Sequence, residues 1–313
     1  MKNLSTIFLT ASLLLGTVII NAQTKFYVHK TDGTKIEYNI AEVDSISFNS
    51  VDVKIDPSTI ASNNLVAYFP FDGDGSDVKG HAVTPINVNA SDFVMGQRDK
   101  AYKGKVGSGF IYSLPANDRI VKANGLTFAM WIKTPAPVDG SPALCTINGT
   151  TGDWDMPGSF LLQMQDAVQF VDSVGFKLYQ FNMDTEWKGQ WSGLFSSEYF
   201  PSNNWFHFVA MYDESTSSYK AYGNGNLIWS EVRYAGPEPE GGGAQPLLGN
   251  MSLPADANKL YVGAWWKMLE GLEVDSWAQN YVGLIDELRI YDRGLTDAEV
   301  KDLFDAEVTQ INK

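Results

Sequence analysis

The sequence predicts an all-β fold, a two-sheet jelly-roll sandwich with a short C-terminal helix and a small N-terminal β-hairpin. From about residue 60, segments rich in aromatic and β-branched residues follow one another, bounded by Gly, Pro, Asn and Asp. Helical periodicity is convincing only in residues 296–304, after the last of these segments. A run of about 250 residues is long for an immunoglobulin-like domain and suits a jelly roll with long loops.

The first 22 residues predict an export signal. Lys2 supplies the positive start, residues 7–20 form an apolar run, and the small Ala22 stands where cleavage is expected. The run is too short for a membrane span, and no second apolar run follows. The alternative is a buried N-terminal helix. With one cysteine, Cys145, the chain cannot form an internal disulfide framework, which suits the periplasm or outer surface of a Gram-negative bacterium.

Residues 23–50 predict the hairpin. Two alternating segments, 25–30 and 35–40, flank Asp32 and Gly33, and an Asp-Gly pair in that position is a strong hairpin signal. Two or three short strands are not stable alone, so we expect this unit to dock on a larger one.

Residues 60–310 predict the sandwich domain and its terminal helix. The expected strands are residues 65–71, 126–133, 205–212, 219–222, 226–229, 259–263 and 283–291. The helix begins at a capping box formed by Thr296 and Glu299.

Five segments of this domain resemble the laminin-G-like, concanavalin A-like jelly-roll domains of bacterial secreted proteins. They are LVAYFPFDG at 65–73, LTFAMWIK at 126–133, WFHFVAMYD at 205–213, LYVG at 260–263 and GLIDELRIYDRGLTDAEV at 283–300. The resemblance covers residues 60–306 and implies a two-sheet sandwich of a family whose members mostly bind glycans or proteins. It also implies enzymes among distant relatives.

Two carboxylates predict a structural calcium site. Strict alternation in residues 283–291 places Asp286 on one face with Leu284, Leu288 and Ile290, and a buried carboxylate needs a partner. First and last strands of jelly rolls usually lie side by side, which brings the acidic turn beginning at Asp72 near Asp286. Such oxygen-rich turns suit calcium, and the resembling family often holds one there. The alternative is that Asp286 only accepts backbone hydrogen bonds and the turn is solvated.

Several tryptophans stand in polar, glycine-rich surroundings that predict a sugar-binding surface. A tryptophan ring stacks on the apolar face of a pyranose while polar neighbours bond its hydroxyls. The expected stacking residues are Trp265 and Trp266, followed by Trp187, Trp191 and Trp277. The alternative is that these rings close the ends of the sandwich or dock the hairpin.

The sequence therefore predicts an exported, non-catalytic protein that binds a glycan or polysaccharide. The first alternative is a protein-interaction module that binds a surface protein and mediates adhesion. The second alternative is a glycoside hydrolase on the same fold. The glucanase pattern Glu-x-Asp-x-x-Glu is incomplete at both places where it begins, Glu42 and Glu273. With 37 acidic against 23 basic residues, a net charge of −14 argues against a nucleic-acid partner.

Overall fold

The structure is a computed structural model of the chain. It describes residues 25–29, 33–43, 55–135, 140–148, 160–164, 175–181, 189–194, 201–235, 243–253 and 256–311. The chain divides into two units, residues 1–53 and 54–313. The predicted export signal lies outside the described residues. Within the described ranges, no helix is both long and apolar enough to cross a membrane.

The first unit contains the hairpin that the sequence predicts. Strands β1 (Lys25–His29) and β2 (Lys35–Asn39) pair antiparallel, and the 3-10 helix η1 (Ile40–Glu42) follows. Gly33, with φ at 84°, provides left-handed backbone just before β2 that other residues adopt at a cost.

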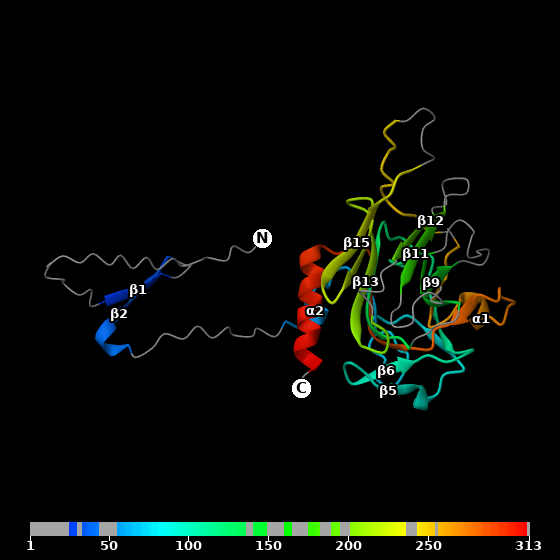
Figure 1. Ribbon diagram of the computed structural model, residues 1–313, viewed down its shortest axis with the longest axis horizontal. Helices are drawn as coiled ribbons and strands as arrows, with labels where there is room; N and C mark the ends of the chain where they lie inside the picture. Colours follow the sequence, from blue (N-terminus) through cyan, green and yellow to red (C-terminus); the bar gives the residue numbers. More distant parts are fainter. Residues whose placement is uncertain are drawn as a thin grey trace. The chain divides into compact units, whose positions relative to one another are not determined.

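The second unit is a sandwich of two sheets, as predicted, and in its described residues each sheet has eight strands (Figure 1). Sheet I contains, in spatial order, β12 (Gly189–Leu194), β11 (Phe176–Phe181), β10 (Phe160–Met164), β9 (Ser141–Asn148), β16 (Lys259–Val262), β7 (Gly109–Ser113) and β4 (Val83–Ile86), with β17 (Ala278–Asn280) beside β9. Sheet II contains β15 (Asn226–Val232), β14 (Ser218–Gly223), β13 (Phe206–Asp213), β8 (Leu126–Lys133), β18 (Leu284–Tyr291), β6 (Lys100–Lys103) and β5 (Phe93–Met95), with β3 (Leu65–Phe69) also beside β18. Short helices η2 (Pro57–Thr59), η3 (Ala90–Asp92) and α1 (Trp266–Leu269) lie in the connections.

The main core lies between the two sheets. Alternate residues of each strand face inward, so Phe128 of β8 and Phe208 of β13 meet Phe110 and Leu260 from sheet I in one cluster. Cys145 is buried in the same cluster, as expected for a small apolar residue. A core of this size explains how the domain can fold without disulfide bonds.

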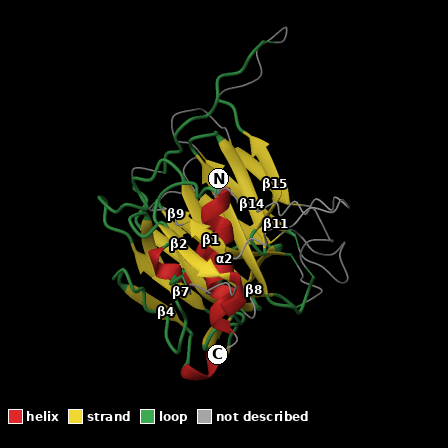
Figure 2. Cartoon of the chain, turned by 90° about the vertical axis from the view of Figure 1, so that its left-hand side faces the viewer, coloured by secondary structure: helices red, strands yellow, loops and turns green. Residues whose placement is uncertain are grey.

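Helix α2 (Asp297–Ile311) covers the outer face of sheet II, on the opposite side of the sandwich from α1 (Figures 1 and 2). The predicted capping box is present: Glu299 N donates to Thr296 Oγ1 at 3.2 Å, and Thr296 N donates to Glu299 Oε2 at 2.9 Å. Leu303 and Ala306 pack against Ala129 and neighbouring residues of the sheet. The helix runs beyond the predicted residue 304 because its second half also has a buried side.

Strand β18 lies beside β3, which confirms the expected pairing of first and last strands. The alternation predicted along β18 is wrong, however, because a β-bulge interrupts it. The register to β8 shifts between Asp286 and Arg289, and the extra residue, Glu287, has φ at 53°. Consequently Leu288 and Ile290 face the core together with Ile285, whereas Asp286 lies on the outer face, opposite Trp131.

Candidate functional site

Three of the tryptophans that the sequence singles out come together around α1. Strand β16 ends at Val262, and the chain turns through Gly263, whose φ is 93°, into Trp265 and α1. The parallel pairing of β17 with β9 then returns Trp277 to the same place. Trp265 and Trp277 meet edge to face, with ring centroids 5.1 Å apart.

Trp265 is the buried member of this group. Only 4% of its surface is exposed, and its Nε1 donates to the carbonyl oxygen of Ser141 at 2.5 Å. Its ring packs in a small cluster with Ala143, Ala278 and the partly buried Trp277. Because it is buried, Trp265 offers no open ring face on which a sugar could stack, and its ring supports Trp277.

Trp266 and Trp277 are half-buried, and both line a small surface hollow, which we call the tryptophan hollow. Its lining is completed by polar and apolar side chains: Trp265, Lys267, Val274, Asp275 and Ala278. The hollow holds about 20 Å³, room for roughly one water molecule. A sugar could therefore not enter it and would have to lie across it.

Helix α1 is fixed to sheet I from its C-terminal end. Glu270, directly after the helix, accepts hydrogen bonds at Oε1 from Tyr261 Oη at 2.9 Å and from Lys259 Nζ at 2.5 Å. The Trp266 ring packs on Tyr261 with centroids 6.3 Å apart. These contacts fix α1 and the Trp266 ring against sheet I.

The two remaining tryptophan candidates cannot be placed at this hollow. Trp187 lies outside the described residues. Trp191 lies in β12, at the end of sheet I away from β16, and its side chain is outside the described part of the structure.

The carboxylate of Asp286 is fully buried and only half satisfied. Its Oδ2 accepts hydrogen bonds from the backbone N–H groups of Gln97, at 2.8 Å, and Arg98, at 2.9 Å. Its Oδ1 has no hydrogen-bond partner among the described residues. Burial raises the pKa of Asp286 to about 8, and the nearby negative charges of Glu287 and Asp72 act in the same direction.

Asp72 and Asp286 are the two carboxylates for which the sequence predicts a calcium site. The orphaned Oδ1 of Asp286 and the exposed carboxylate of Asp72 are hard oxygen ligands of the kind that calcium prefers. Asp77, from the same acidic turn as Asp72, is already bonded to His81 Nδ1 at 2.5 Å. Within the described residues no group of three or more His, Cys, Asp or Glu side chains could hold a metal ion. The remaining ligands would thus have to be carbonyl oxygens or water, which calcium accepts.

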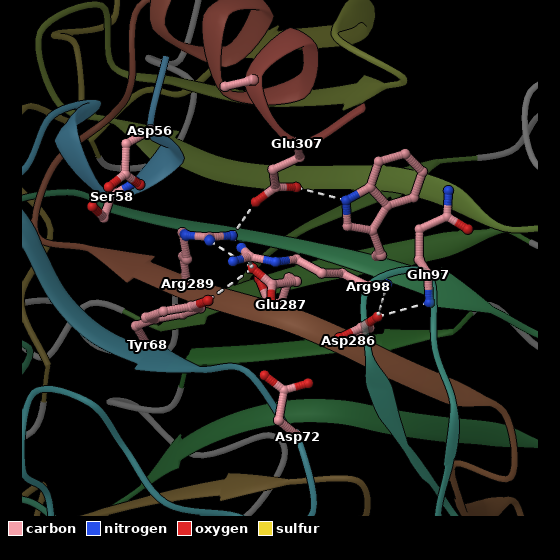
Figure 3. Close-up of polar contacts among 12 residues, drawn as sticks. Asp56, Ser58, Tyr68, Asp72, Gln97, Arg98, Asp286, Glu287, Arg289 and Glu307 are labelled. Carbon is pink, nitrogen blue, oxygen red and sulfur yellow. Dashed lines mark hydrogen bonds and ion pairs between the residues drawn. The ribbon is translucent and has the colours of Figure 1, made fainter. Parts of the chain in front are cut away.

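A second group of charged residues lies under α2, where the sequence indicated nothing (Figure 3). Arg289 is 1% exposed and bonds Glu287 Oε2 at 2.7 Å and the carboxylate of Glu307 from α2. Glu287 Oε2 also accepts from Tyr68 Oη at 2.9 Å, and Glu307 Oε2 accepts from Trp131 Nε1 at 2.6 Å. We call Glu287, Arg289 and Glu307 the buried charge cluster.

The electrostatics of this cluster indicate a structural role. Burial raises the pKa of Glu307, while the positive charge of Arg289 opposes that rise. Burial lowers the pKa of the adjacent His207 to about 3, so the imidazole is neutral, and its ring nitrogens have no hydrogen-bond partner among the described residues. His207 is fully buried, beside Trp131 and Phe304. Glu287, Arg289 and Glu307 are each at most 2% exposed, so their charges act on one another and on neighbouring side chains.

The incomplete glucanase patterns do not form a carboxylate pair on a strand. Glu273 and Asp275 lie in the connection between α1 and β17, outside any strand, so alternation does not aim them at a common cleft. Glu42 ends η1 in the first unit, and its partner Asp44 lies outside the described residues.

Comparison with protein families identifies the class of the chain. The family model described as the concanavalin A-like lectin/glucanases superfamily matches residues 107–301, more than half of the 313 residues. The chain therefore belongs to this superfamily, as the resemblance implied. Comparison with curated proteins gives no match.

Solved structures share the fold at low sequence identity. The binding domain of Paraclostridial Mosquitocidal Protein 1 is 16% identical with a TM-score of 0.53, over 77% of this chain and 52% of that one. The botulinum neurotoxin serotype D binding domain is 13% identical with a TM-score of 0.49, over 78% and 52%. Domain 4 of AbnA, a GH43 extracellular arabinanase from Geobacillus stearothermophilus solved with arabinotriose, is 22% identical with a TM-score of 0.47, over 77% and 98%. The chain spans about half the length of the two toxin domains, and at these identities the likeness shows the fold alone.

Proposed function

We propose that this protein is a lectin-like, non-catalytic module that binds a carbohydrate across the tryptophan hollow. Membership of the concanavalin A-like superfamily and the binding-domain fold support a binding module. The observation that carries the sugar assignment is the pair Trp266 and Trp277, two half-buried indoles of which the first packs on Tyr261 and the second on the buried Trp265.

The chemistry around the two rings suits a pyranose. An indole face offers a flat apolar surface to the C–H side of a sugar, and such contacts contribute most when the ring is already fixed. Lys267 and the exposed Asp275 flank the rings and supply a donor and an acceptor for sugar hydroxyls. Because the hollow is small, the ligand would lie on the surface, as one unit of a longer glycan can.

The direct test is native affinity electrophoresis of the full chain through gels containing plant, mucin and microbial polysaccharides. The test variant is Trp266→Ala/Trp277→Ala, and the matched control is Trp229→Ala, which removes a half-buried indole from β15 in sheet II. Retardation by one glycan class, lost in the test variant and kept in the control, is the expected result. Retardation that survives in the test variant would move the site elsewhere. Failure of every glycan would favour the surface-protein alternative.

We also propose that a calcium ion bound by Asp72 and Asp286 stabilises the domain. Bound there, the ion would replace the proton of the buried Asp286 and give its orphaned Oδ1 a partner. Asp286 is fixed by the backbone of residues 97 and 98, and Asp72 Oδ1 accepts from Lys100 N at 3.1 Å. Both carboxylates are thus held by backbone N–H groups of residues 97–100, where the chain passes from β5 into β6.

A further inference from the structure

A larger hollow opens on sheet II, away from the tryptophan hollow. It has a volume of about 370 Å³, within the size range of small-molecule sites. It is formed by the ends of β8, β18 and β6, with β5 and the segment before β13 at its sides. β5 and β6 lie at the lower end of the sandwich in Figure 1. Its lining residues are Val94, Lys103, Lys133, Pro135, Asn203, Val282, Gly283 and Leu284. We call it the two-lysine hollow.

Sheet register brings the two lysines to the same face. Leu284 of β18 pairs with Lys103 of β6 on one side and with Lys133 of β8 on the other. Directly opposed residues project their side chains to the same side of a sheet, and neighbouring strands lie about 5 Å apart. The two lysine Cα atoms are therefore roughly 10 Å apart with Leu284 between them, a separation that two flexible side chains can close around one anion.

Neither lysine forms an ion pair with any residue that the structure describes. The carboxylate of Asp92 pairs instead with Lys105 Nζ, at 2.6 Å. That bond is the main cause that lowers the pKa of Asp92, and the charge of Lys103 adds a smaller contribution. The chain as a whole has a net charge of −14. Two ammonium groups left without carboxylate partners in such an acidic protein form a local site for an anion.

Backbone hydrogen bonds fix the segments that line the hollow. Gly104 N donates to the carbonyl oxygen of Gly283 at 2.9 Å, and Asn203 N donates to that of Thr134 at 2.6 Å. A Cβ on Gly283 would lie 2.4 Å from the Tyr281 hydroxyl and 2.6 Å from the carbonyl oxygen of Lys133. Glycine at this position is thus what allows the strands to close beneath the hollow.

We propose that the two-lysine hollow binds a uronate, a sugar ring that carries a carboxylate. The ammonium groups of Lys103 and Lys133 hold the carboxylate, the apolar ring face rests on Leu284 and Val282, and the Asn203 amide bonds a hydroxyl. A purely apolar ligand would form no ion pair with either lysine, and an inorganic anion would not cover the apolar surface of Leu284 and Val282. This site goes beyond the proposed function, since it uses another surface and does not depend on the tryptophan hollow.

The test is isothermal titration of the full chain with trigalacturonate and with its fully methyl-esterified form, which keeps the rings and removes the charge. The test variant is Lys103→Gln/Lys133→Gln. The control is Lys79→Gln/Lys122→Gln, which removes the same charge from two exposed lysines outside the hollow.

We expect trigalacturonate to bind the native chain and the control equally, and to bind the test variant at least about tenfold more weakly. The ester should bind the native chain about as weakly as the acid binds the test variant. Equal affinity of the acid for test and control variants, equal affinity of acid and ester, or no binding to the native chain would each overturn the proposal. Trp266→Ala/Trp277→Ala should bind the acid normally, so the two proposals fail separately.

Discussion

Around α1, tryptophan and charged side chains remain at the surface, whereas under α2 the same kinds of side chain are sealed from water. Trp266 is half-exposed beside Lys267, while Trp131 is 4% exposed and donates to the buried Glu307. This difference in exposure shows that residue type alone does not identify a binding site. Under α2 the buried charges pair with one another, and Glu307 joins the helix to Arg289 and Trp131 of the sheet. Around α1, Trp266 and Trp277 keep part of their surface exposed. If this contrast is right, substitutions in the two regions should have opposite consequences, on stability in one and on binding in the other.

The largest expected effect is on stability, at the buried charge cluster. Arg289→Met removes the guanidinium and leaves Glu287 and Glu307 buried without their cation, which should lower the free energy of unfolding by about 3–5 kcal/mol. Arg119→Met is the matched control, because the Arg119 side chain is 54% exposed in its ion pair with Asp292. This substitution should lower the free energy of unfolding by less than about 1 kcal/mol. Urea unfolding followed by circular dichroism measures both. Equal losses in the two variants would show that the buried cluster contributes no more than a surface pair.

The next effect is that of calcium. At a calcium concentration 100-fold above its Kd, the native chain should gain about 2.7 kcal/mol against unfolding, since the ion binds only the folded site. Asp286→Asn should abolish this gain, and Asp305→Asn, at an exposed ion pair on α2, should keep it. Thermal unfolding with and without calcium gives the answer. A gain that persists in Asp286→Asn would place the ion elsewhere, and no gain in the native chain would contradict the site.

A smaller effect is expected at the His81 bridge, which joins two loops. His81 Nε2 contacts Asp118 Oδ2 at 2.8 Å and Nδ1 contacts Asp77 Oδ2 at 2.5 Å, and these bonds raise the pKa of His81 to about 9. A histidine whose pKa is higher in the folded than in the unfolded state stabilises below its ordinary pKa. That contribution, about 1 kcal/mol after solvent screening, should disappear as pH rises from about 6.5 to 9.

The measurement for His81 is the difference in free energy of unfolding between the native chain and His81→Gln. This difference should be largest at pH 6 and shrink toward pH 9.5. A difference that stays constant across this range would mean that the imidazole charge contributes nothing.

Much of the sandwich is predictable from the sequence, and the buried charge cluster is not. Strand β8, the capping box at Thr296 and the pairing of β3 with β18 depend on local patterns or on general topology. The bulge at Glu287 breaks strict alternation without a glycine to signal it, so the face of Asp286 could not be deduced.

Long-range partners explain the rest of what the sequence missed. Glu307 finds Arg289 and Trp131 only after α2 folds onto sheet II, and nothing near Glu307 in the sequence indicates either partner. Likewise, Trp265 and Trp266 share one polar neighbourhood in the sequence. Only the approach of Ser141 and Trp277 decides that the first is buried and the second is not.

The substitution with the smallest expected effect on stability should have the largest effect on glycan binding. Trp266→Ala/Trp277→Ala removes half-exposed rings and should lower the free energy of unfolding far less than Arg289→Met. The central claim is best tested by titrating the retarding glycan into the native chain and this variant, and then measuring the length of the glycan. The account predicts saturable binding that the variant loses, with a glycan of unchanged length. Binding that the variant retains, or a glycan that is shortened, would contradict it.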